Sequence, residues 1–311
     1  MFNIVGLGNS VLDMLVVVKN FPEEDTKAGP ALQVLRQGGG LVGTGICAAG
    51  KLGESCTIFA SVGDDAAGNF CRKQWNEYGV DTSYTVVRPG SETPSCICII
   101  NKENGSRTII GTSNVNEVCS PITTDEVSLE AIKNAKVFHV GGNRTNPGQI
   151  GLMKYARENG VKVLLDIEMP DAGTDDVLAN TDFIITSKKF LPAYTKTNDT
   201  KEGLKMVYDK FKPVIVVTTL GNSGGMYYNG KEYGTYPIFP AEVVDTTGCG
   251  DVFHGAFAYG YCQGWSWSKI CHFSSGVSSM KCMKLGGRSG IPTFPELKEY
   301  LTPYYDLDAH E

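Results

Sequence analysis

The segment 245–251, Asp-Thr-Thr-Gly-Cys-Gly-Asp, combines an acidic residue with the flexible backbone that anion binding requires. Gly248 and Gly250, with the small Cys249 between them, permit a tight loop whose N–H groups converge. The apolar stretch 252–263 that follows is predicted to be a helix, and a helix N-terminus favours a negative group. Asp251, in the first turn, could reach a substrate hydroxyl and remove its proton as a general base.

A simpler interpretation gives Asp251 a structural role only, because an acidic residue in the first turn stabilises a helix through its dipole. That role needs one carboxylate and no glycine-rich loop. The two glycines and the upstream Asp245-Thr246-Thr247 therefore favour the chemical interpretation.

A second glycine-rich segment, 218–225, follows the predicted strand 214–219. It would lie at the carboxyl end of a parallel strand, where α/β sheets bind ligands. The same residues also fit an ordinary hairpin turn. By contrast, 6–11 lacks the third glycine of a dinucleotide-binding motif, and 45–52 ends in Leu52 where a P-loop needs a hydroxyl.

The elements that must position these loops follow an α/β order. Apolar runs at 57–62, 137–140, 161–166, 183–186 and 214–219 alternate with predicted helices, which indicates a mostly parallel sheet. Residues 2–7 and 15–18 predict a hairpin or one long bent strand. The segments 32–37, 95–101 and 108–111 predict strands without intervening helices, which indicates a small antiparallel sheet outside the α/β body. We find no linker or repeat, so one domain, 1–311, is expected. The predicted helices are 41–52, 65–78, 125–134, 148–159, 201–211, 252–263, 268–284 and 295–301.

Composition narrows the classes of partner. With 28 basic and 34 acidic residues the net charge is −6, which opposes binding to nucleic acid or to an anionic membrane. The ten cysteines form no Cys-x-x-Cys pair, and neither a signal peptide nor a membrane span is expected. We therefore expect reduced cysteines and a cytoplasmic location. The 37 glycines exceed ordinary usage, and many of them gather in a few short segments, of which 38–53 is the richest.

These motifs together resemble a known family. Segment 245–251 is similar to the Asp-Thr-x-Gly-Ala-Gly-Asp signature of the ribokinase-like (PfkB) carbohydrate kinases, with Cys249 in the alanine position. Segments 39–53, 62–68, 219–224 and 276–292 resemble further motifs of that family. The resemblance implies an ATP-dependent sugar kinase with a three-layer α/β fold, a mostly parallel central sheet and a small antiparallel β lid. The lid would be formed by about 12–20, 32–37 and 95–111, and its exposed edges could pair with a second chain in a homodimer.

The resemblance also implies a role for individual residues. Asp251 would be the general base, and Gly248, Cys249 and Gly250 the anion hole for the transferred phosphoryl group. Asp13, Gly39, Gly40 and Thr44 would bind the sugar, and Asp245 and Thr247 a monovalent cation such as K⁺. Mg²⁺ would be bound mainly by ATP. The implied ATP-binding residues are Ser187, Lys188, Thr219, Gly221, Gly224, Gly276 and Ser279.

The chain departs from the family pattern at two places. The family's Asn-x-x-Glu motif is replaced by Ser187-Lys188-Lys189-Phe190, so Lys188 could neutralise phosphate and Asp166 with Glu168 could help to organise Mg²⁺. Thr44 stands where ribokinases carry Asn, which argues against ribose. Arg144 could pair with an anionic group of a sugar derivative or lie on the surface. A nucleoside kinase of the same family and a non-catalytic sugar or nucleotide sensor remain the alternatives.

Overall fold

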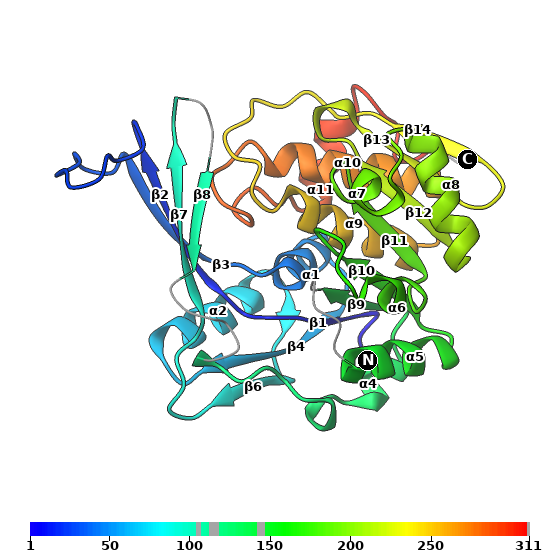
Figure 1. The fold of residues 1–311 in the computed structure, drawn as a ribbon, viewed down its shortest axis with the longest axis horizontal. Coiled ribbons are helices and arrows are strands. Elements are labelled where there is room, and N and C mark those ends of the chain that lie inside the picture. The colour runs from blue at the N-terminus through cyan, green and yellow to red at the C-terminus, as the bar shows by residue number, and fades with distance from the viewer. Residues whose placement is uncertain (104–106, 112–117, 142–146, 310–311) are drawn as a thin grey trace.

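The computed structural model describes residues 1–103, 107–111, 118–141 and 147–309. A large sheet carries helices on both faces, and a smaller sheet stands beside it (Figure 1). The α/β fold with a mostly parallel central sheet and a small second sheet, predicted from the sequence, is confirmed. The strands of the large sheet are β1 (Ile4–Leu7), β4 (Cys56–Gly63), β5 (Val80–Asp81), β6 (Thr85–Arg88), β9 (Val137–Gly141), β10 (Lys162–Asp166), β11 (Phe183–Ser187), β12 (Ile215–Thr219), β13 (Gly225–Tyr228) and β14 (Tyr233–Tyr236).

The large sheet has the strand order β14-β13-β12-β11-β10-β9-β1-β4-β5, with β6 also paired to β4. Every pair from β12 to β5 is parallel, whereas β13 and β14 are antiparallel. Successive residues face opposite sides of the sheet, as a pleated strand requires. Val137 packs on one side and Phe138 on the other, in two separate hydrophobic clusters.

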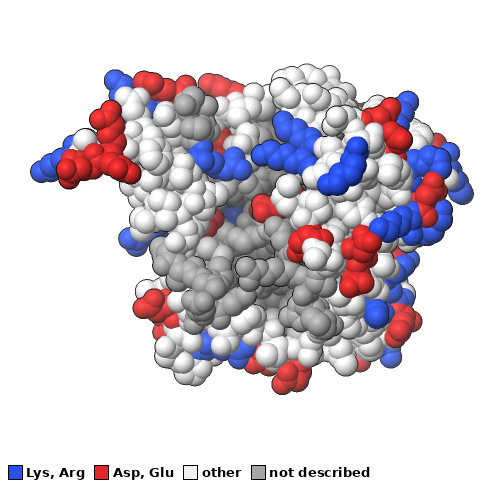
Figure 2. Space-filling view, in the orientation of Figure 1, with Lys and Arg blue, Asp and Glu red and all other residues white. Residues whose placement is uncertain are grey.

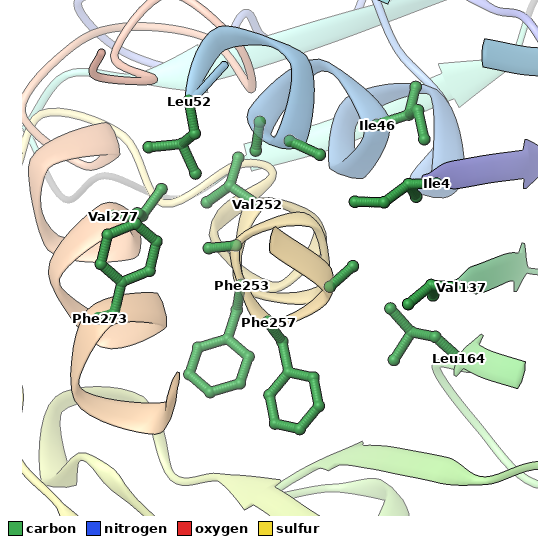
Figure 3. Close-up of a cluster of buried hydrophobic side chains, with 14 of the residues drawn as sticks. Ile4, Ile46, Leu52, Val137, Leu164, Val252, Phe253, Phe257, Phe273 and Val277 are labelled. Atoms are coloured by element: carbon green, nitrogen blue, oxygen red, sulfur yellow. The ribbon is translucent and has the colours of Figure 1, made fainter. Parts of the chain in front are cut away.

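One face of the sheet positions the candidate site. There α9 lies between α1 and α10, and Phe253, Phe257 and Phe273 fill the space around it (Figure 3). The glycines Gly45 and Gly255 let α1 and α9 approach closely, because a Cβ on Gly255 would overlap the Gly45 carbonyl. The helices packed on this face are α1 (Leu41–Lys51), α2 (Ala66–Glu77), α9 (Cys249–Cys262), α10 (Trp267–Lys281) and α11 (Phe294–Leu301).

The opposite face is covered by a second set of helices. Their apolar residues pack against alternate residues of the same strands, such as Val163 and Leu165. Two of these helices, of five and six residues, escaped sequence prediction because so short a segment shows no full helical period. These helices are α4 (Leu129–Lys133), α5 (Pro147–Glu158), α6 (Thr174–Leu178), α7 (Phe190–Thr195) and α8 (Thr200–Phe211), with the 3₁₀ turns η1 (Thr124–Glu126) and η2 (Gly221–Ser223) nearby in the chain.

The smaller sheet, called the lid below, consists of β2 (Leu12–Val18), β3 (Gln33–Gly38), β7 (Ser95–Asn101) and β8 (Arg107–Gly111). Its order is β3-β2-β7-β8; the outer pairs are antiparallel and the central pair β2–β7 is parallel. The expected hairpin between 2–7 and 15–18 is wrong, because β1 lies in the large sheet and β2 in the lid. The chain crosses between them near Gly8, whose N–H donates to Phe59 O, and Leu12, whose N–H donates to Pro94 O.

Candidate active site

The loop 245–250 enters α9 through a left-handed turn. Gly248 has φ +75°, and a Cβ there would lie 2.8 Å from Gly287 Cα. Around Gly250, in contrast, a Cβ would find nothing within 4 Å. The first glycine is therefore required by the backbone, whereas the second leaves open space at the helix N-terminus, where an anion is favoured.

Asp245 holds this loop together. Its Oδ1 accepts hydrogen bonds from Thr247 N–H (2.8 Å) and Thr247 Oγ1 (2.7 Å), and its Oδ2 accepts one from Gly286 N–H (2.8 Å). Burial alone would raise the pKa of Asp245, but these hydrogen bonds and the charge of Lys281 lower it below its usual value. The loop therefore carries a fixed negative charge.

Lys281 is a fully buried cation beside the same loop. Its Nζ donates to the Asp245 carbonyl (2.8 Å), and its side chain has no solvent exposure. Burying an ammonium is costly unless it is paired. The nearby Asp245 carboxylate offsets that cost, so the charge of Lys281 and the geometry of the loop depend on each other.

Asp251 lies in the first turn of α9, in an acidic and buried surrounding. Burial raises its pKa well above the usual value, and Asp166 raises it further, while His254 and Lys281 act in the opposite direction. Asp166, the last residue of β10, has its pKa raised to about 7 by burial and by Glu168. A carboxylate with a raised pKa suits a general base, because proton transfer is most effective when its pKa is near the working pH.

Two buried histidines lie beneath these carboxylates. His254 Nδ1 is 2.8 Å from Gly250 O and 3.5 Å from Asp166 Oδ2, and its ring stacks on His139 with 5.9 Å between centroids. Burial lowers the pKa of both imidazoles below its usual value.

A cavity of about 630 Å³ opens on one side of the loop 245–250. That volume falls within the range of small-molecule sites. The sequence-predicted residues Thr219, Gly221, Gly224, Cys249, Gly250 and Ser279 all line it. Ser278 and Cys282, within the segment 276–292 that resembles a family motif, line it as well, and so do Phe253 and Ser275, which the sequence had not indicated.

The segment 218–225 forms the hairpin turn that its sequence allows, and its part in binding a ligand stays a prediction. It is the turn between the antiparallel strands β12 and β13, and its Thr219, Gly221 and Gly224 line the cavity. The exposed Lys188 lies next to it, since Nζ would be 3.7 Å from a Cβ on Gly221. Ser187 Oγ instead accepts from the backbone of Lys189 (3.3 Å) and Phe190 (3.2 Å), at the start of α7.

Asp13 and the glycines at the start of α1 meet on the other side of the loop. A Cβ on Gly39 would overlap the Asp13 carboxylate, and Cys96 Sγ donates to Asp13 Oδ1 (3.0 Å). Burial raises the pKa of Asp13, against the hydrogen bond from Cys96 and the charge of Arg288. Gly40, with φ +86°, then begins α1.

Thr44, predicted to bind the sugar, contacts Arg288. Arg288 Nε lies 3.4 Å from Thr44 Oγ1, and the guanidinium also donates to Gln74 Oε1 (3.0 Å) and to the Gly39 carbonyl (2.7 Å). Arg288 is 1% exposed. Thr44 is therefore connected to the carbonyl of Gly39 through Arg288, and its contact with a sugar stays a prediction.

The segment 276–292, which resembles a family motif, contributes to two places. Ser278, Ser279 and Cys282 line the cavity, whereas Gly286 and Gly287 pack against Gln37, and Gly287 separates Gly248 from Thr44. Gly276 packs under α11, where a Cβ would be 2.9 Å from the Leu301 methyl groups, and it is not among the residues that line the cavity, so its part in ATP binding stays a prediction. Arg144 lies outside the described residues.

Sequence reasoning missed three cationic contributions. Lys281 and Arg288 are buried within segments that look like ordinary helix and loop, and only their distant partners reveal their roles. Arg107, in the lid, donates to Thr246 Oγ1 (3.2 Å) and so links the lid to the loop 245–250. Arg107 directly precedes the strand predicted at 108–111. A charged residue next to an apolar strand can face a binding site, and this was the one indication of its role in the sequence.

Charge is dispersed on the surface. Figure 2 shows acidic and basic side chains mixed over the face in view, around a hollow between the lid and the body. Among the described residues no helix is long and apolar enough to cross a membrane.

A family model named pfkB family carbohydrate kinase matches residues 1–294. The chain belongs to the PfkB family of carbohydrate kinases. As a PfkB carbohydrate kinase it is a phosphotransferase with an alcohol group as acceptor.

Similar proteins span nearly the whole PfkB chain. Ketohexokinase of Mus musculus is 27% identical over 300 residues, which cover 93% of this chain and 98% of the relative. A putative ribokinase from Agrobacterium tumefaciens has a TM-score of 0.88 at 24% identity, covering 97% and 98% of the two chains. A putative ribokinase II from E. coli, solved with ATP and Mg²⁺, has a TM-score of 0.83 at 18% identity, with 98% and 100% covered.

Proposed function

We propose that this PfkB kinase transfers the γ-phosphoryl group of ATP to a hydroxyl of a sugar or sugar derivative, with Asp251 as general base. The observation that carries the proposal is the loop 245–250, whose Thr246, Cys249 and Gly250 line the cavity. Gly248 packs against Gly287, and the neighbouring Arg288 donates to the carbonyl of Gly39, beside Asp13, where we place the sugar. Asp251, in the first turn of α9, would lie between the two ligands.

The chemistry needs positioning and charge neutralisation more than covalent catalysis. The acceptor hydroxyl would lose its proton to Asp251 while its oxygen attacks the γ-phosphorus. The N–H groups of Gly248, Cys249 and Gly250 would then stabilise the charge on the transferred group. Since the pKa of Asp251 is raised, the base loses activity as the pH falls through that value.

The cavity would hold the nucleotide, with its phosphates toward Thr219, Gly221, Gly224 and the ammonium of Lys188. The putative ribokinase II from E. coli, which shares the fold, is in complex with ATP and Mg²⁺, which supports ATP as the nucleotide. Ser279 would lie deeper in the cavity, where its Oγ already accepts from Phe239 N–H (3.2 Å).

The residues present fit a divalent cation. Asp166 Oδ2 is buried and has no hydrogen-bond partner among the described residues, and Glu168 lies near it. Carboxylate oxygens are ligands that Mg²⁺ prefers. Asp166 and Glu168 would hold Mg²⁺, directly or through water, and the ion would neutralise the phosphates of ATP. Asp245 and Thr247, on the ionised loop, would hold a monovalent cation such as K⁺.

Asp13 would accept a hydrogen bond from a substrate hydroxyl, and Gly39 and Gly40 would let the sugar approach the backbone. The lid would cover the sugar, with Arg107 over the loop. The exposed apolar residues of the lid, Val34 (56%) and Ile109 (57%), support pairing of two lids in a homodimer. The ten free cysteines suit a reducing compartment, and we propose the cytoplasm.

The test is ADP release from ATP with a panel of acceptors: fructose, tagatose, ribose, 2-keto-3-deoxygluconate, sulfofructose and nucleosides. We expect a sugar or sugar derivative to be phosphorylated, and Asp251→Asn to lose about 10²-fold or more in kcat. The control is Asp209→Asn, at an exposed residue of α8 paired with Lys205.

Activity on nucleosides alone would show a nucleoside kinase. Tight binding of a sugar or nucleotide without any transfer would show a sensor. Activity of Asp251→Asn within a few-fold of the unsubstituted enzyme would show that Asp251 is not the base.

A further inference from the structure

Two cysteine thiols touch at the anion-hole loop. Cys249 Sγ and Cys282 Sγ are 2.8 Å apart, and both residues line the cavity beside the loop 245–250. Both are partly exposed, whereas most of the ten cysteines are buried. An oxidant that enters the cavity can therefore reach this pair.

The backbone holds the two thiols together. Cys249 begins α9 and Cys282 directly follows α10, and these helices pack on each other. The carbonyl of Cys282 accepts from the N–H groups of Val244 (2.8 Å) and Asp245 (3.1 Å), and Ser278 Oγ donates to the carbonyl of Cys249 (2.9 Å). The same hydrogen bonds therefore hold both the loop 245–250 and the contact between the two thiols in place.

The two sulfurs have different neighbours. Cys249 Sγ also lies 3.8 Å from the Ser278 carbonyl, whereas Cys282 follows the last residue of α10. A thiolate is the nucleophilic form of cysteine, and a second cysteine in contact with the oxidised sulfur can resolve it as a disulfide.

We propose that Cys249 and Cys282 form a reversible oxidation site that switches the kinase off, with hydrogen peroxide as the class of oxidant. The thiolate of one of the two cysteines attacks one peroxide oxygen; the O–O bond breaks, hydroxide leaves, and the sulfur becomes a sulfenic acid. The sulfur of the other cysteine attacks that sulfur, the S–O bond breaks, and water leaves with the proton of the attacking thiol. A dithiol reductant restores both thiols.

Inactivation follows from the place of Cys249. The two sulfur atoms of a disulfide lie about 2.05 Å apart. Formation of the Cys249–Cys282 bond therefore shortens the distance between these sulfurs from 2.8 Å and draws the first residue of α9 toward the end of α10. The N–H groups of the anion hole belong to that residue and its neighbours. A displacement of about 1 Å at a catalytic group costs about 10²-fold, so a loss of at least about tenfold in kcat is expected.

The test treats the purified protein with peroxide, blocks free thiols by alkylation, and maps peptides by mass spectrometry without reduction. We expect a cross-linked peptide pair containing Cys249 and Cys282, lighter by two hydrogens, and activity that dithiothreitol restores. Cys249→Ala, which places the family's usual residue there, is compared with its own reduced sample and is expected to resist inactivation. Cys262→Ser, at the other end of α9, is the matched control and is expected to behave like the unsubstituted protein.

The peptide map does not depend on the proposed function, whereas the activity loss rests on it. Absence of the 249–282 cross-link after peroxide treatment would overturn the proposal even in a fully active kinase. The proposal would also be overturned if peroxide inactivated Cys249→Ala as strongly as the unsubstituted protein and dithiothreitol restored its activity. A cross-link in a protein that phosphorylates no acceptor would leave the oxidation site standing and refute the kinase assignment alone.

Discussion

Substitution by alanine should have opposite effects on stability at Gly248 and at Gly250, the two glycines of the loop 245–250. Gly248 has φ +75°, and a Cβ would lie 2.8 Å from Gly287 Cα, a backbone atom that cannot move aside cheaply. The left-handed conformation alone costs a non-glycine residue roughly 1–2 kcal/mol. With the contact added, we expect Gly248→Ala to lower the free energy of unfolding by at least about 2 kcal/mol.

Gly250 lies inside the first turn of α9, and a Cβ there would meet nothing within 4 Å. Alanine is a better helix former than glycine by up to about 1 kcal/mol, so Gly250→Ala should leave the protein equally stable or more stable. The added methyl group would stand in the open space where we place the phosphoryl group. Its kcat should therefore fall by about tenfold or more despite an intact fold.

The measurements are urea unfolding followed by circular dichroism and steady-state kinetics with the acceptor that the panel identifies. Thermal shifts are less sensitive, since 1 kcal/mol moves the melting temperature of a 311-residue chain by only about 1.5 °C. A Gly248→Ala protein as stable as the original would refute the left-handed turn. A Gly250→Ala protein with full activity would refute the placement of the phosphoryl group.

Further predictions concern charge and assembly. Asp166 raises the pKa of Asp251, so Asp166→Asn should move the acid limb of the kcat/KM profile to lower pH; an unmoved limb would contradict the coupling. The raised pKa of Asp166 itself, about 7, means that its ionisation costs stability as the pH rises from about 4 toward 7, so Asp166→Asn should flatten that decline in urea unfolding. Lys281→Met should destabilise the protein by about 1–3 kcal/mol, because the buried Asp245 carbonyl loses its donor; full stability would show that the contact is dispensable. Replacing K⁺ by choline should lower kcat if Asp245 and Thr247 hold a cation, and an unchanged rate would reject that site. Ile109→Lys, on the exposed face of the lid, should shift a lid-paired dimer to a monomer in light scattering, and an unchanged mass would exclude that interface.

The sequence predicted those parts of the site that depend on local backbone geometry. Gly248 and Gly250 mark a tight loop before a helix, and Thr219 to Gly224 mark the end of a strand, so both were found from spacing alone. The helices around the site were also predicted, because α1 and α9 show long apolar patterns. The hairpin turn predicted as one interpretation of 218–225 is confirmed, and Thr219, Gly221 and Gly224 of this turn line the cavity, so the two interpretations are compatible.

The contacts that could not be predicted join residues far apart in the chain. Arg288 reaches Thr44 across 244 positions and the Gly39 carbonyl across 249, and nothing near Arg288 in the sequence indicates burial. The crossing from β1 to β2 was misjudged for a related reason, because two short apolar segments do not show whether they share a sheet. Tertiary packing decided each case.

The position of Arg288 also bears on biosynthesis. Gly39, Thr44 and Gln74 leave the ribosome early, yet the guanidinium that joins them is translated after more than two hundred further residues. Until then the carbonyl of Gly39, beside Asp13, lacks this donor, so the sugar site that we propose would be incomplete in the nascent chain. It would be completed only after the loop 245–250 and the helix α10 have also been made.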